Sequence, residues 1–431
     1  MANADWKTYK PLLLPNIKNL HEIDVYEKNG GYKALRTVLE NKDSKWTKEN
    51  VTNEVKSAGL RGRGGAGFNT GLKWSFMPKP DGGPRYIAAN GDESEPGTFK
   101  DRQIFEYNPH LFIEGALIAA YAMSITSVYV YIRGEYNSWI QKLQKAVDDA
   151  YKKGYIGKNV LGSGMDIDLY VHKGAGAYIC GEESSLMESL EGKRAYPRIK
   201  PPFPAQRGIW GRPTTINNIE TLSNVPLIIN NGASWYSSMG AEKHPGPVLY
   251  GLSGHINKPG VYEFTTGMLI TDLLNEVAGG MRNGKKLKAL VPGGSSTPIL
   301  RADQIDGVRM DAESLRQVGS MMGTAGMLFL DEDTDIVDFL WRITHFYHHE
   351  SYGQCTPCRE GTGWLEKLLL KIKNGEGEIR DLDILLDLCT QMEGRTVCAL
   401  ADAAAWPVRY TITRFREEFE SRCKNTIFAT A

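Results

Sequence analysis

The sequence has few cysteines and no excess of charge of either sign. Cysteine occurs at six of its 431 positions, and lysine plus arginine equals aspartate plus glutamate at 51 each. Six cysteines in so long a chain do not form a disulfide framework, so a reducing compartment fits and clustered thiols are expected to be ligands. Because the balanced charge provides no basic field, nucleic acid is not an expected partner, and partners must bind at local sites.

The sequence also lacks a secretory leader and a long apolar run. Its start, MANADWKTYK, has no charged segment followed by an apolar core. The longest apolar stretch, LFIEGALIAAYAM, contains Glu114 and is shorter than the roughly 20 residues that cross a bilayer. We therefore expect a cytoplasmic chain with no direct membrane insertion, which could still dock on a membrane complex.

The sequence pattern divides the chain into four parts, as expected because 431 residues are too many for one ordinary hydrophobic core. Residues 1–60 are mixed and helical. Over 61–240, β-rich runs such as SVYVYIRG alternate with helical patterns such as YNSWIQKLQKAVDDAYKKG, which predicts an α/β domain with a parallel sheet covered by helices on both faces. Short strands and one helix, LITDLLNEVAGG, over 241–333 predict a small α+β module. The 3.6-residue periodicity of 334–431, for example in RYTITRFREEFESRC, predicts a helical bundle in which a turn with Cys355 and Cys358 joins two helices.

A glycine loop, RGRGGAGFNTGLKW, follows the first helical segment. It contains the pattern G-x-G-x-x-G from Gly62 to Gly67, but the text before it is helical, which is not the context of an ordinary NAD-binding Rossmann start. Its glycines allow close approach of the backbone, and its amides with Arg61, Arg63 and Lys73 could bind a phosphate. A flexible RGG-like tract is the alternative.

Acidic and amide side chains follow the first predicted strand. In IAANGDESEPGTFKDR, Asn90, Asp92, Glu93 and Glu95 come directly after that strand. Open α/β sheets bind ligands at the carboxyl ends of their strands, and carboxylates there can accept hydrogen bonds from ribityl or ribose hydroxyls. A solvated acidic turn is the alternative.

The strand, glycine turn and helix arrangement recurs in HKGAGAYICGEESSLMESLEGKR. Its glycines would bring the backbone close to a flat ligand, with Tyr178 as part of the wall. Glu182 and Glu183 lie in the first helical turn, where capping is the alternative to ligand binding. The following RIKPPFPAQRG is a rigid proline arm that presents Lys200 and Phe203, a cation and a ring suited to an adenine face.

Together these motifs resemble the flavin-containing, NADH-binding subunit of respiratory complex I, which also occurs as the diaphorase subunit of NAD-linked hydrogenases and formate dehydrogenases. The resemblance covers nearly the whole chain and rests on GLRGRGGAGFNTGLKW, NGDESEPGTFKDR, GAGAYICGEESSLMESLEGKR, PRIKPPFPA, PTTINNIETL and CTPCREG in this order. It implies an α/β fold with an FMN-binding Rossmann-like domain, a ubiquitin-like (β-grasp) α+β domain and a C-terminal helical bundle with an iron–sulfur site.

The resemblance also implies which residues hold the cofactors. The FMN site would consist of Gly62, Arg63, Gly64, Lys73, Asn90, Asp92, Glu93, Tyr178, Gly181, Glu182, Asn217, Asn218 and Thr221. The NADH site would consist of Phe68, Phe76, Glu95, Glu183, Lys200 and Phe203, with Phe68 and Phe203 flanking the adenine. Hydride would pass from nicotinamide C4 to flavin N5, so no side chain is needed as a catalytic proton donor.

The C-terminal cysteines resemble the ligand set of the family's [4Fe-4S] cluster, with one departure. The family motif is C-x-x-C-x-x-C plus a distant cysteine. Cys355 and Cys358 match two members of the triplet and Cys398 matches the distant one, whereas Tyr352 stands where the first cysteine is expected. The resemblance therefore implies an iron–sulfur cluster for which this chain offers three of four thiolates.

Several arrangements are compatible with Tyr352. Its phenolate could ligate the fourth iron, although oxygen is a harder ligand and an unperturbed tyrosine has a pKa of about 10. The site could hold a [3Fe-4S] cluster, a [4Fe-4S] cluster whose fourth iron takes water or another group, or no cluster. His348, His349 or Cys389 could replace the missing thiolate. Zinc bound by three cysteines and a histidine is the non-redox version.

The resemblance further implies partners and a location. As the electron-entry subunit of a bacterial complex I, the chain would bind a thioredoxin-like [2Fe-2S] subunit and a large iron–sulfur subunit. It would belong to the peripheral arm on the cytoplasmic face of the inner membrane. The diaphorase subunit of a soluble hydrogenase or formate dehydrogenase is the alternative enzyme. A non-catalytic assembly protein that keeps the fold and binds nucleotide is the alternative from another class.

Overall fold

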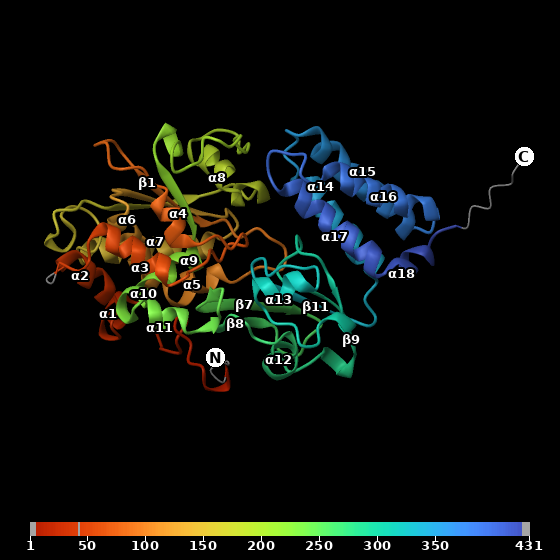
Figure 1. Ribbon diagram of the computed structural model, residues 1–431, viewed down its shortest axis with the longest axis horizontal. Helices are drawn as coiled ribbons and strands as arrows, with labels where there is room; N and C mark the ends of the chain where they lie inside the picture. The colour runs from red at the N-terminus through yellow and green to blue at the C-terminus, as the bar shows by residue number, and fades with distance from the viewer. Residues whose placement is uncertain (1–5, 42–43, 425–431) are drawn as a thin grey trace, which may run out of the picture.

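An α/β region, a second sheet and a helical bundle make up the protein, which is described at residues 6–41 and 44–424 by a computed structural model (Figure 1). The four strands of the α/β region are all parallel and lie in the order β3-β2-β1-β4. They are β1 (Tyr86–Gly91), β2 (Ser127–Ile132), β3 (Asp168–Lys173) and β4 (Thr214–Asn218). Because the strands are parallel, the residues that follow β1 and end β4 meet at one edge.

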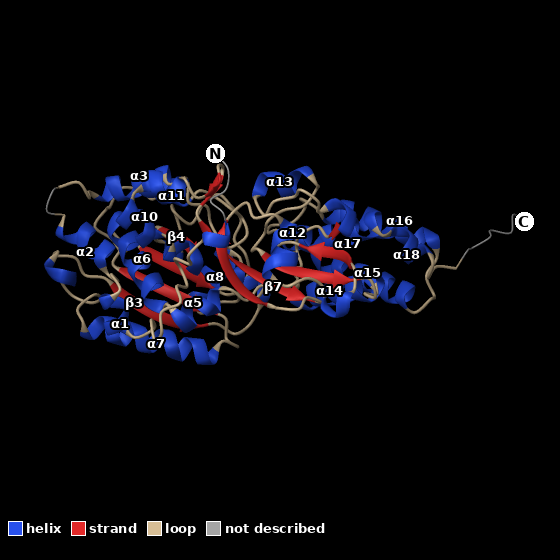
Figure 2. Cartoon of the chain, turned by 90° about the horizontal axis from the view of Figure 1, so that it is seen from below, coloured by secondary structure: helices blue, strands red, loops and turns tan. Residues whose placement is uncertain are grey.

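Helices cover both faces of this sheet, as the sequence predicted. On one face, Ile87 and Val128 pack into the largest apolar core, which includes most of α6. On the other face, Ala88 and Tyr131 pack against Leu186 of α8. Figure 2 shows α7 and α1 beyond the β3 edge and α3, α10 and α11 beyond the β4 edge. The helices after the first strand are α5 (Asp101–Tyr107), α6 (Pro109–Ala122), α7 (Asn137–Lys152), α8 (Glu183–Leu190), α9 (Ile219–Ser223), α10 (Val225–Asn231) and α11 (Ala233–Ser237).

The N-terminal helices join the same core. They are α1 (Ile23–Lys28), α2 (Lys33–Glu40), α3 (Lys48–Ser57) and α4 (Thr70–Ser75). Glu114, the acid inside the longest apolar run, is buried in α6 and accepts hydrogen bonds from the Tyr26 hydroxyl and the Tyr32 and Leu35 amides. Its carboxylate therefore fixes α1 and α2 on α6. Across the described ranges, we find no helix with the length and apolar character needed to cross a bilayer.

The second sheet is mixed and has the order β10-β9-β11-β7-β8. β11 runs parallel to β7 at its centre, and the other neighbours are antiparallel. Its strands are β7 (Pro247–Gly254), β8 (Gly260–Thr265), β9 (Leu287–Val291), β10 (Leu300–Arg301) and β11 (Gly326–Asp331), preceded by the hairpin of β5 (Gly240–Ala241) and β6 (His244–Pro245) and accompanied by α13 (Ala312–Gln317). The helix predicted in LITDLLNEVAGG is shorter than expected, because α12 (Ile270–Asp272) widens into a π-helical turn at Leu273–Val277.

A buried carboxylate ties the start of the chain to this second sheet. Glu263 of β8 accepts hydrogen bonds from the backbone amides of Leu12, Leu13 and Leu14 and from the Tyr9 hydroxyl. Four donors on one buried carboxylate compensate for its removal from water. The N-terminal segment thus contacts both the α/β region and the second sheet.

In the C-terminal bundle, the helices next to the cysteines have boundaries that differ from the predicted ones. It contains α14 (Ile336–Glu350), α15 (Thr356–Lys373), α16 (Ile379–Met392), α17 (Leu400–Arg414) and α18 (Arg416–Glu420). The sequence predicted Cys355 and Cys358 in a turn between helices, but Pro357 is compatible with a first helical turn, and α15 begins at Thr356. The segment RYTITRFREEFESRC falls in two helices, α18 and the end of α17, which begins at Leu400, two residues after Cys398, and includes Pro407.

Candidate functional site

Two adjoining cavities, together called the cleft, open at the carboxyl ends of β1 and β4. The larger has a volume of about 940 Å³ and lies between the glycine loop and the proline arm, and the smaller, of about 430 Å³, extends to the second sheet and the bundle. Every residue that was predicted to bind FMN or NADH lines one of them. Those that line only the larger cavity are Gly62, Phe68, Lys73, Phe76, Glu183, Lys200, Phe203, Asn217 and Thr221. Those that line only the smaller cavity are Arg63, Asp92, Glu93, Glu95 and Tyr178. Both cavities are lined by Gly64, Asn90, Gly181, Glu182 and Asn218.

The glycine loop is a compact loop between α3 and α4. Its ends are joined by hydrogen bonds from the Gly62 amide to the Phe68 carbonyl and from the Thr70 amide to the Leu60 carbonyl. A Cβ atom at Gly64 would lie 3.2 Å from the Asn218 Cβ, a tight contact that favours glycine at this close approach. No strand precedes the loop within the described residues, in agreement with the interpretation that this is not an ordinary Rossmann start.

The two arginines of the loop donate from their side chains to backbone carbonyls. The Arg63 guanidinium is buried and donates to the Pro245 carbonyl at 2.7 Å, while its backbone amide donates to the Thr221 hydroxyl at 2.8 Å. Arg61 donates to the Lys243 carbonyl at 2.7 Å. The Nε and Nη1 atoms of Arg63 are buried without a partner, so phosphate binding by these arginines stays a prediction. Lys73 is the loop cation that lines the larger cavity.

The residues after β1 have divergent roles. Glu93 accepts hydrogen bonds from the Lys100 and Asp101 amides and the Tyr136 hydroxyl, so its carboxylate is engaged at the start of α5. Burial and the nearby Asp101 raise the pKa of Glu93. Glu95 accepts from the Tyr178 hydroxyl at 2.7 Å. These contacts connect the strand end to a helix and to the opposite wall of the smaller cavity.

Asp92 carries an unsatisfied acceptor at this position. Its Oδ1 accepts a short hydrogen bond from Ser94, whereas its buried Oδ2 has no partner. The Thr70 and Thr215 hydroxyls, which line the larger cavity, are also buried without a partner. Buried polar atoms are rarely left unpaired, so these three fit a ligand that carries hydroxyl groups. Burial raises the pKa of Asp92 to about 7.

Asp92→Asn should stabilise the flavin-free protein increasingly as the pH rises. Because the folded-state pKa lies above the unfolded value of about 3.9, the cost of the charged Asp92 is small near pH 4, grows towards pH 7 and is complete above it. We expect the advantage of the variant to grow by about 2.6 kcal/mol between pH 5 and 8. Thermal unfolding at both pH values measures it. Asp303→Asn, at an exposed site, is the matched control, and a constant advantage would contradict the assignment.

Glu182 and Glu183 are adjacent but do different things. Glu182 caps α8, accepting from the Ser184 and Ser185 amides at 2.7 and 2.9 Å, so the capping alternative holds for this residue. Glu183 lies between two ammonium groups, with Lys200 at 2.6 Å and Lys73 at 3.1 Å. Burial alone would raise the pKa of Glu183, but the two lysines outweigh it and hold the pKa below its usual range.

Three phenylalanines present exposed rings to the larger cavity. Phe68 is 48% exposed, Phe76 55% and Phe203 54%. The rings of Phe68 and Phe76 are 6.1 Å apart. Large exposed rings gathered at a cleft are a typical platform for a flat ligand.

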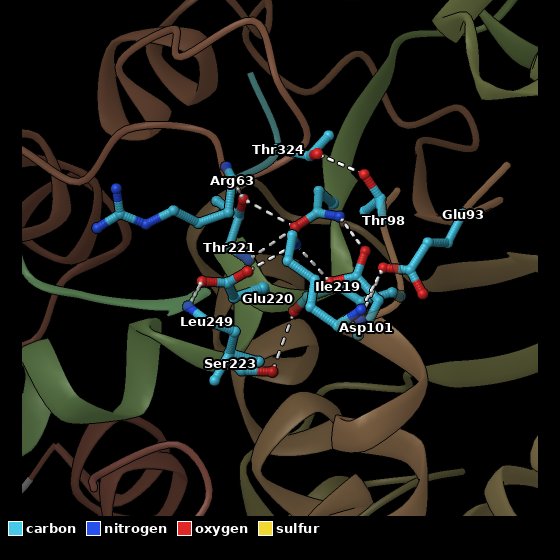
Figure 3. A network of polar contacts seen from close by, with 12 residues as sticks. Arg63, Glu93, Thr98, Asp101, Ile219, Glu220, Thr221, Ser223, Leu249 and Thr324 are labelled. Atoms are coloured by element: carbon cyan, nitrogen blue, oxygen red, sulfur yellow. Dashed lines mark hydrogen bonds and ion pairs between the residues drawn. The ribbon is translucent and has the colours of Figure 1, made fainter. Parts of the chain in front are cut away.

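A buried ionic network behind the cleft was missed by the sequence analysis (Figure 3). The Lys100 ammonium lies 2.8 Å from Asp101 and 2.6 Å from Glu220. Asp101 accepts from the Asn218 amide group at 2.6 Å, and Glu220 accepts from the Leu249 amide of β7 at 3.0 Å. The network therefore joins a cleft residue to the second sheet. The sequence contains no signal for it, because Lys100 in GTFKDRQ and Glu220 in INNIETLSN stand among other polar residues and their pairing joins segments far apart in the chain.

The predicted cluster residues are brought together between α14, α15 and α17. Cys355 is the N-cap of α15, Cys358 is in its first turn, and Cys398 precedes α17 and lines the smaller cavity. Each sulfur has a hydrogen-bonding neighbour: the Val397 amide at 3.4 Å from Cys355, the Ser351 hydroxyl at 3.4 Å from Cys358 and the Tyr352 hydroxyl at 3.3 Å from Cys398. Burial raises the pKa of Cys358 to about 11. Three soft sulfur donors with their own hydrogen bonds fit an iron–sulfur cluster.

The proposed substitute ligands are engaged elsewhere. His348 pairs with Glu366 at 2.5 Å, and His349 pairs with Glu350 at 3.1 Å. Cys389 is fully buried, and its thiol contacts the Ala405 carbonyl at 3.4 Å. Over residues 6–41 and 44–424, no three His, Cys, Asp or Glu side chains are arranged to hold a single metal ion, so the zinc alternative has no geometric support.

Comparison with known proteins matches the whole architecture. Residues 55–227 match the Nuo51 FMN-binding domain, residues 249–338 the SLBB domain and residues 338–422 the NADH-ubiquinone oxidoreductase-F iron-sulfur binding region. The F subunit of NADH-quinone oxidoreductase from Rickettsia bellii is 49% identical over 403 residues, which cover 93% of this chain and 95% of the relative. The chain belongs to the F-subunit family of NADH-quinone oxidoreductases.

Other members and neighbours agree with this family assignment. The second F subunit of NADH-quinone oxidoreductase from Rhizobium meliloti is 48% identical over 422 residues, which cover 96% of this chain and 99% of the relative. An NAD⁺-reducing [NiFe]-hydrogenase in its H₂-reduced state matches with a TM-score of 0.81 and 34% identity over 88% of this chain. This chain spans 63% of that hydrogenase chain.

Membership of the F-subunit family confirms the predicted fold class, enzyme class and cofactors. The chain is a flavin-dependent NADH dehydrogenase subunit with an FMN-binding domain and an iron–sulfur region, and its cofactors are FMN, NAD(H) and an iron–sulfur cluster. Tyr352 stands inside the iron–sulfur region.

Proposed function

We propose that this chain is the point at which electrons from NADH enter a larger NADH-quinone oxidoreductase assembly. NADH binds in the larger cavity, FMN lies where the two cavities meet, and electrons leave singly towards the cysteine site. The observation that carries the proposal is the continuity of the cavities, because they share Asn90 and Asn218 and the smaller one ends at Cys398. FMN supplies the conversion of a two-electron hydride donor into single-electron steps.

The chain's own contribution on the flavin side is a close-fitting polar shell. The glycine loop provides backbone amides at close approach, and Asn90 and Asn218 lie on neighbouring strands of the floor. The unpaired Asp92 oxygen can accept a hydrogen bond from a ribityl hydroxyl, and the Thr70 and Thr215 hydroxyls can donate to ribityl or phosphate oxygens. This shell would orient the flavin and exclude water from it.

On the nucleotide side, the aromatic rings and the lysines contact different parts of NADH. Phe68 and Phe203 flank the adenine, and Phe76 extends the apolar wall. Lys200 faces the phosphates of NADH, Lys73 of the predicted FMN site lies beside it, and Glu183 partly neutralises both lysines. Glu95, held by Tyr178, orients the nicotinamide end.

Glu183→Gln should tighten NADH binding. The substitution removes a carboxylate that pairs two ammonium groups, which then become available to the phosphates of a dianionic ligand. We expect the Kd for NADH to fall about fivefold, or about 1 kcal/mol, and the gain to shrink in high salt. Calorimetric titration at two ionic strengths measures this. Glu313→Gln removes a carboxylate from an exposed pair outside the cleft and serves as control. Unchanged affinity and turnover would count against Glu183 as part of the NADH site.

The assembly partners are proposed from the family. The relatives carry the name of a quinone oxidoreductase component, which supports docking on a thioredoxin-like [2Fe-2S] subunit and a large iron–sulfur subunit in a peripheral arm on the cytoplasmic face. The hydrogenase neighbour supports the diaphorase role as the second candidate. Subunits that copurify with a tagged chain distinguish the two, since a hydrogenase or formate dehydrogenase subunit would accompany a diaphorase.

The direct test is anaerobic addition of NADH to the purified FMN-loaded protein. We expect the visible flavin absorbance to bleach and ferricyanide to restore it. A flavin that stays oxidised although NADH binds would contradict the proposal and favour the non-catalytic assembly protein. A matched titration with Phe203→Ala, which weakens the proposed adenine contact, should require more NADH for the same bleaching.

A further inference from the structure

Tyr352 stands where the family resemblance implies a cysteine, and its hydroxyl lies beside a sulfur atom. It follows the end of α14, and its ring lies 5.6 Å from that of Tyr196 in the α/β region. The hydroxyl oxygen is 3.3 Å from the Cys398 sulfur, which is hydrogen-bond distance for a sulfur acceptor. The side chain is thus directed at one of the three thiolate ligands.

This contact distinguishes a hydrogen-bond donor from a fourth ligand. In a cubane cluster, terminal ligands bind different irons and project outwards from different corners, so their donor atoms lie well beyond hydrogen-bond distance of one another. An oxygen within 3.3 Å of the Cys398 sulfur is therefore placed to donate to that sulfur rather than to bind a separate iron. A phenolate oxygen would also be a hard ligand beside three soft ones.

The structure provides no replacement thiolate at this corner. Among the described residues, the remaining cysteines are Cys180, Cys389 and Cys423, and none of them lines the cavity that contains Cys398. Cys180 is buried against α8, and Cys389 lies within the bundle core. His348 and His349 are paired with carboxylates. Cys398 borders the bundle end of the smaller cavity, beside Ala399, Leu400, Ala403 and Trp406, where no further thiol or imidazole of the described ranges lines the wall.

We propose that this chain holds its cluster through Cys355, Cys358 and Cys398 alone, that Tyr352 donates a hydrogen bond to Cys398, and that the fourth iron takes a small exogenous ligand, either water or a low-molecular-weight thiol. The inference rests on the iron–sulfur part of the proposed function and deepens it. A fourth iron without a protein thiolate is expected to be removable, whereas an iron held by a fourth cysteine is retained.

Controlled oxidation of the anaerobically purified protein measures that lability. Ferricyanide takes one electron as the site loses iron, so that [4Fe-4S]²⁺ gives [3Fe-4S]⁺, Fe²⁺ and ferrocyanide. We expect an EPR signal of the oxidised three-iron cluster and about one iron released per protein into a ferrous chelator. Added ferrous iron and dithionite should restore the four-iron cluster. Retention of all four irons under these conditions would overturn the proposal.

Two variants separate the roles open to Tyr352. Tyr352→Cys supplies the fourth thiolate and should keep its four irons under the same oxidation. Tyr352→Phe removes only the hydroxyl, so it should keep the wild-type lability and lower the midpoint potential of the cluster, because a hydrogen bond to a sulfur ligand is lost. If Tyr352 were itself a ligand, wild-type protein would resist oxidation and only the phenylalanine variant would lose iron.

The exogenous ligand is identified by adding 2-mercaptoethanol to thiol-free protein. A change in the EPR spectrum of the NADH-reduced or dithionite-reduced wild-type cluster, absent in Tyr352→Cys, indicates an open iron that binds thiol. An unchanged spectrum together with iron release assigns water, and an equal change in both proteins would overturn the open corner. Flavin bleaching by NADH is recorded on each sample, so failure of the electron-entry function is distinguished from failure of this inference.

Discussion

Lys100→Met is expected to lower the melting temperature by roughly 6–12 °C and to release much of the FMN. The ammonium is the counter-charge for Asp101 and Glu220, and all three side chains are at most 5% exposed. Although burial disfavours its charge, these carboxylates and Glu93 raise the pKa of Lys100 well above its usual range. Removing it leaves buried carboxylates without a cation, which typically costs about 3–5 kcal/mol. The flavin is affected because Asp101 holds Asn218 on the cavity wall.

Differential scanning fluorimetry and flavin content after gel filtration measure both effects. Lys145→Met is the control, because it removes an exposed ammonium from a surface pair with Asp149 and should change stability by less than about 0.5 kcal/mol. The double variant Lys100→Met with Glu220→Gln should recover part of the loss, because it removes the stranded charge as well. A melting temperature equal to that of wild type would mean that the network does not stabilise the fold.

Phe203→Ala is expected to raise the Kd for NADH tenfold or more. A base stacked on an aromatic ring contributes about 1–3 kcal/mol, and Phe203 is the ring of the proline arm that lines the larger cavity together with the glycine loop. Because the ring is 54% exposed without a ligand, its loss should hardly affect stability. Steady-state kinetics should show an increased KM and a nearly unchanged kcat, since the adenine is remote from the reacting atoms.

Tyr107→Ala is the matched control for this substitution. Tyr107 is 56% exposed and lies outside the cleft, so its removal tests for a general effect of losing a surface ring. Phe203→Trp should keep affinity near wild type because it retains a stacking surface. An unaltered Kd in Phe203→Ala would exclude this ring from the adenine contact.

Local sequence signals were sufficient for the sheet and for the contents of the cleft. Runs such as SVYVYIRG became β2, and the residues after β1 meet the glycine loop because parallel strands end at one edge. The sequence could not reveal the directions of individual side chains. The Arg63 guanidinium donates to the Pro245 carbonyl, and Glu93 turns to the amides of α5. Such directions depend on partners that become neighbours only after folding.

Helix boundaries, and ion pairs between residues far apart in the chain, could not be predicted from the sequence either. Glycine and proline near Cys355 and Cys358 suggested a turn, yet Pro357 occupies the first turn of α15, where its missing amide hydrogen costs nothing. The Lys100 to Glu220 pair joins segments that no periodicity relates. Tyr352 was visible as a departure from the cysteine rhythm, but its contact with Cys398 required the packing of α14 on α17.

The smaller cavity has a consequence for dissecting the protein into modules. Its wall includes Asn90 from the first sheet, Thr324 from the loop before β11 and Leu400 from α17, so all three regions contribute to one enclosure. A fragment limited to residues 55–227 would contain every residue proposed to bind FMN and yet leave that enclosure open on two sides. Genetic rearrangement of this family should therefore tolerate additions at the chain ends far better than exchange of a single region.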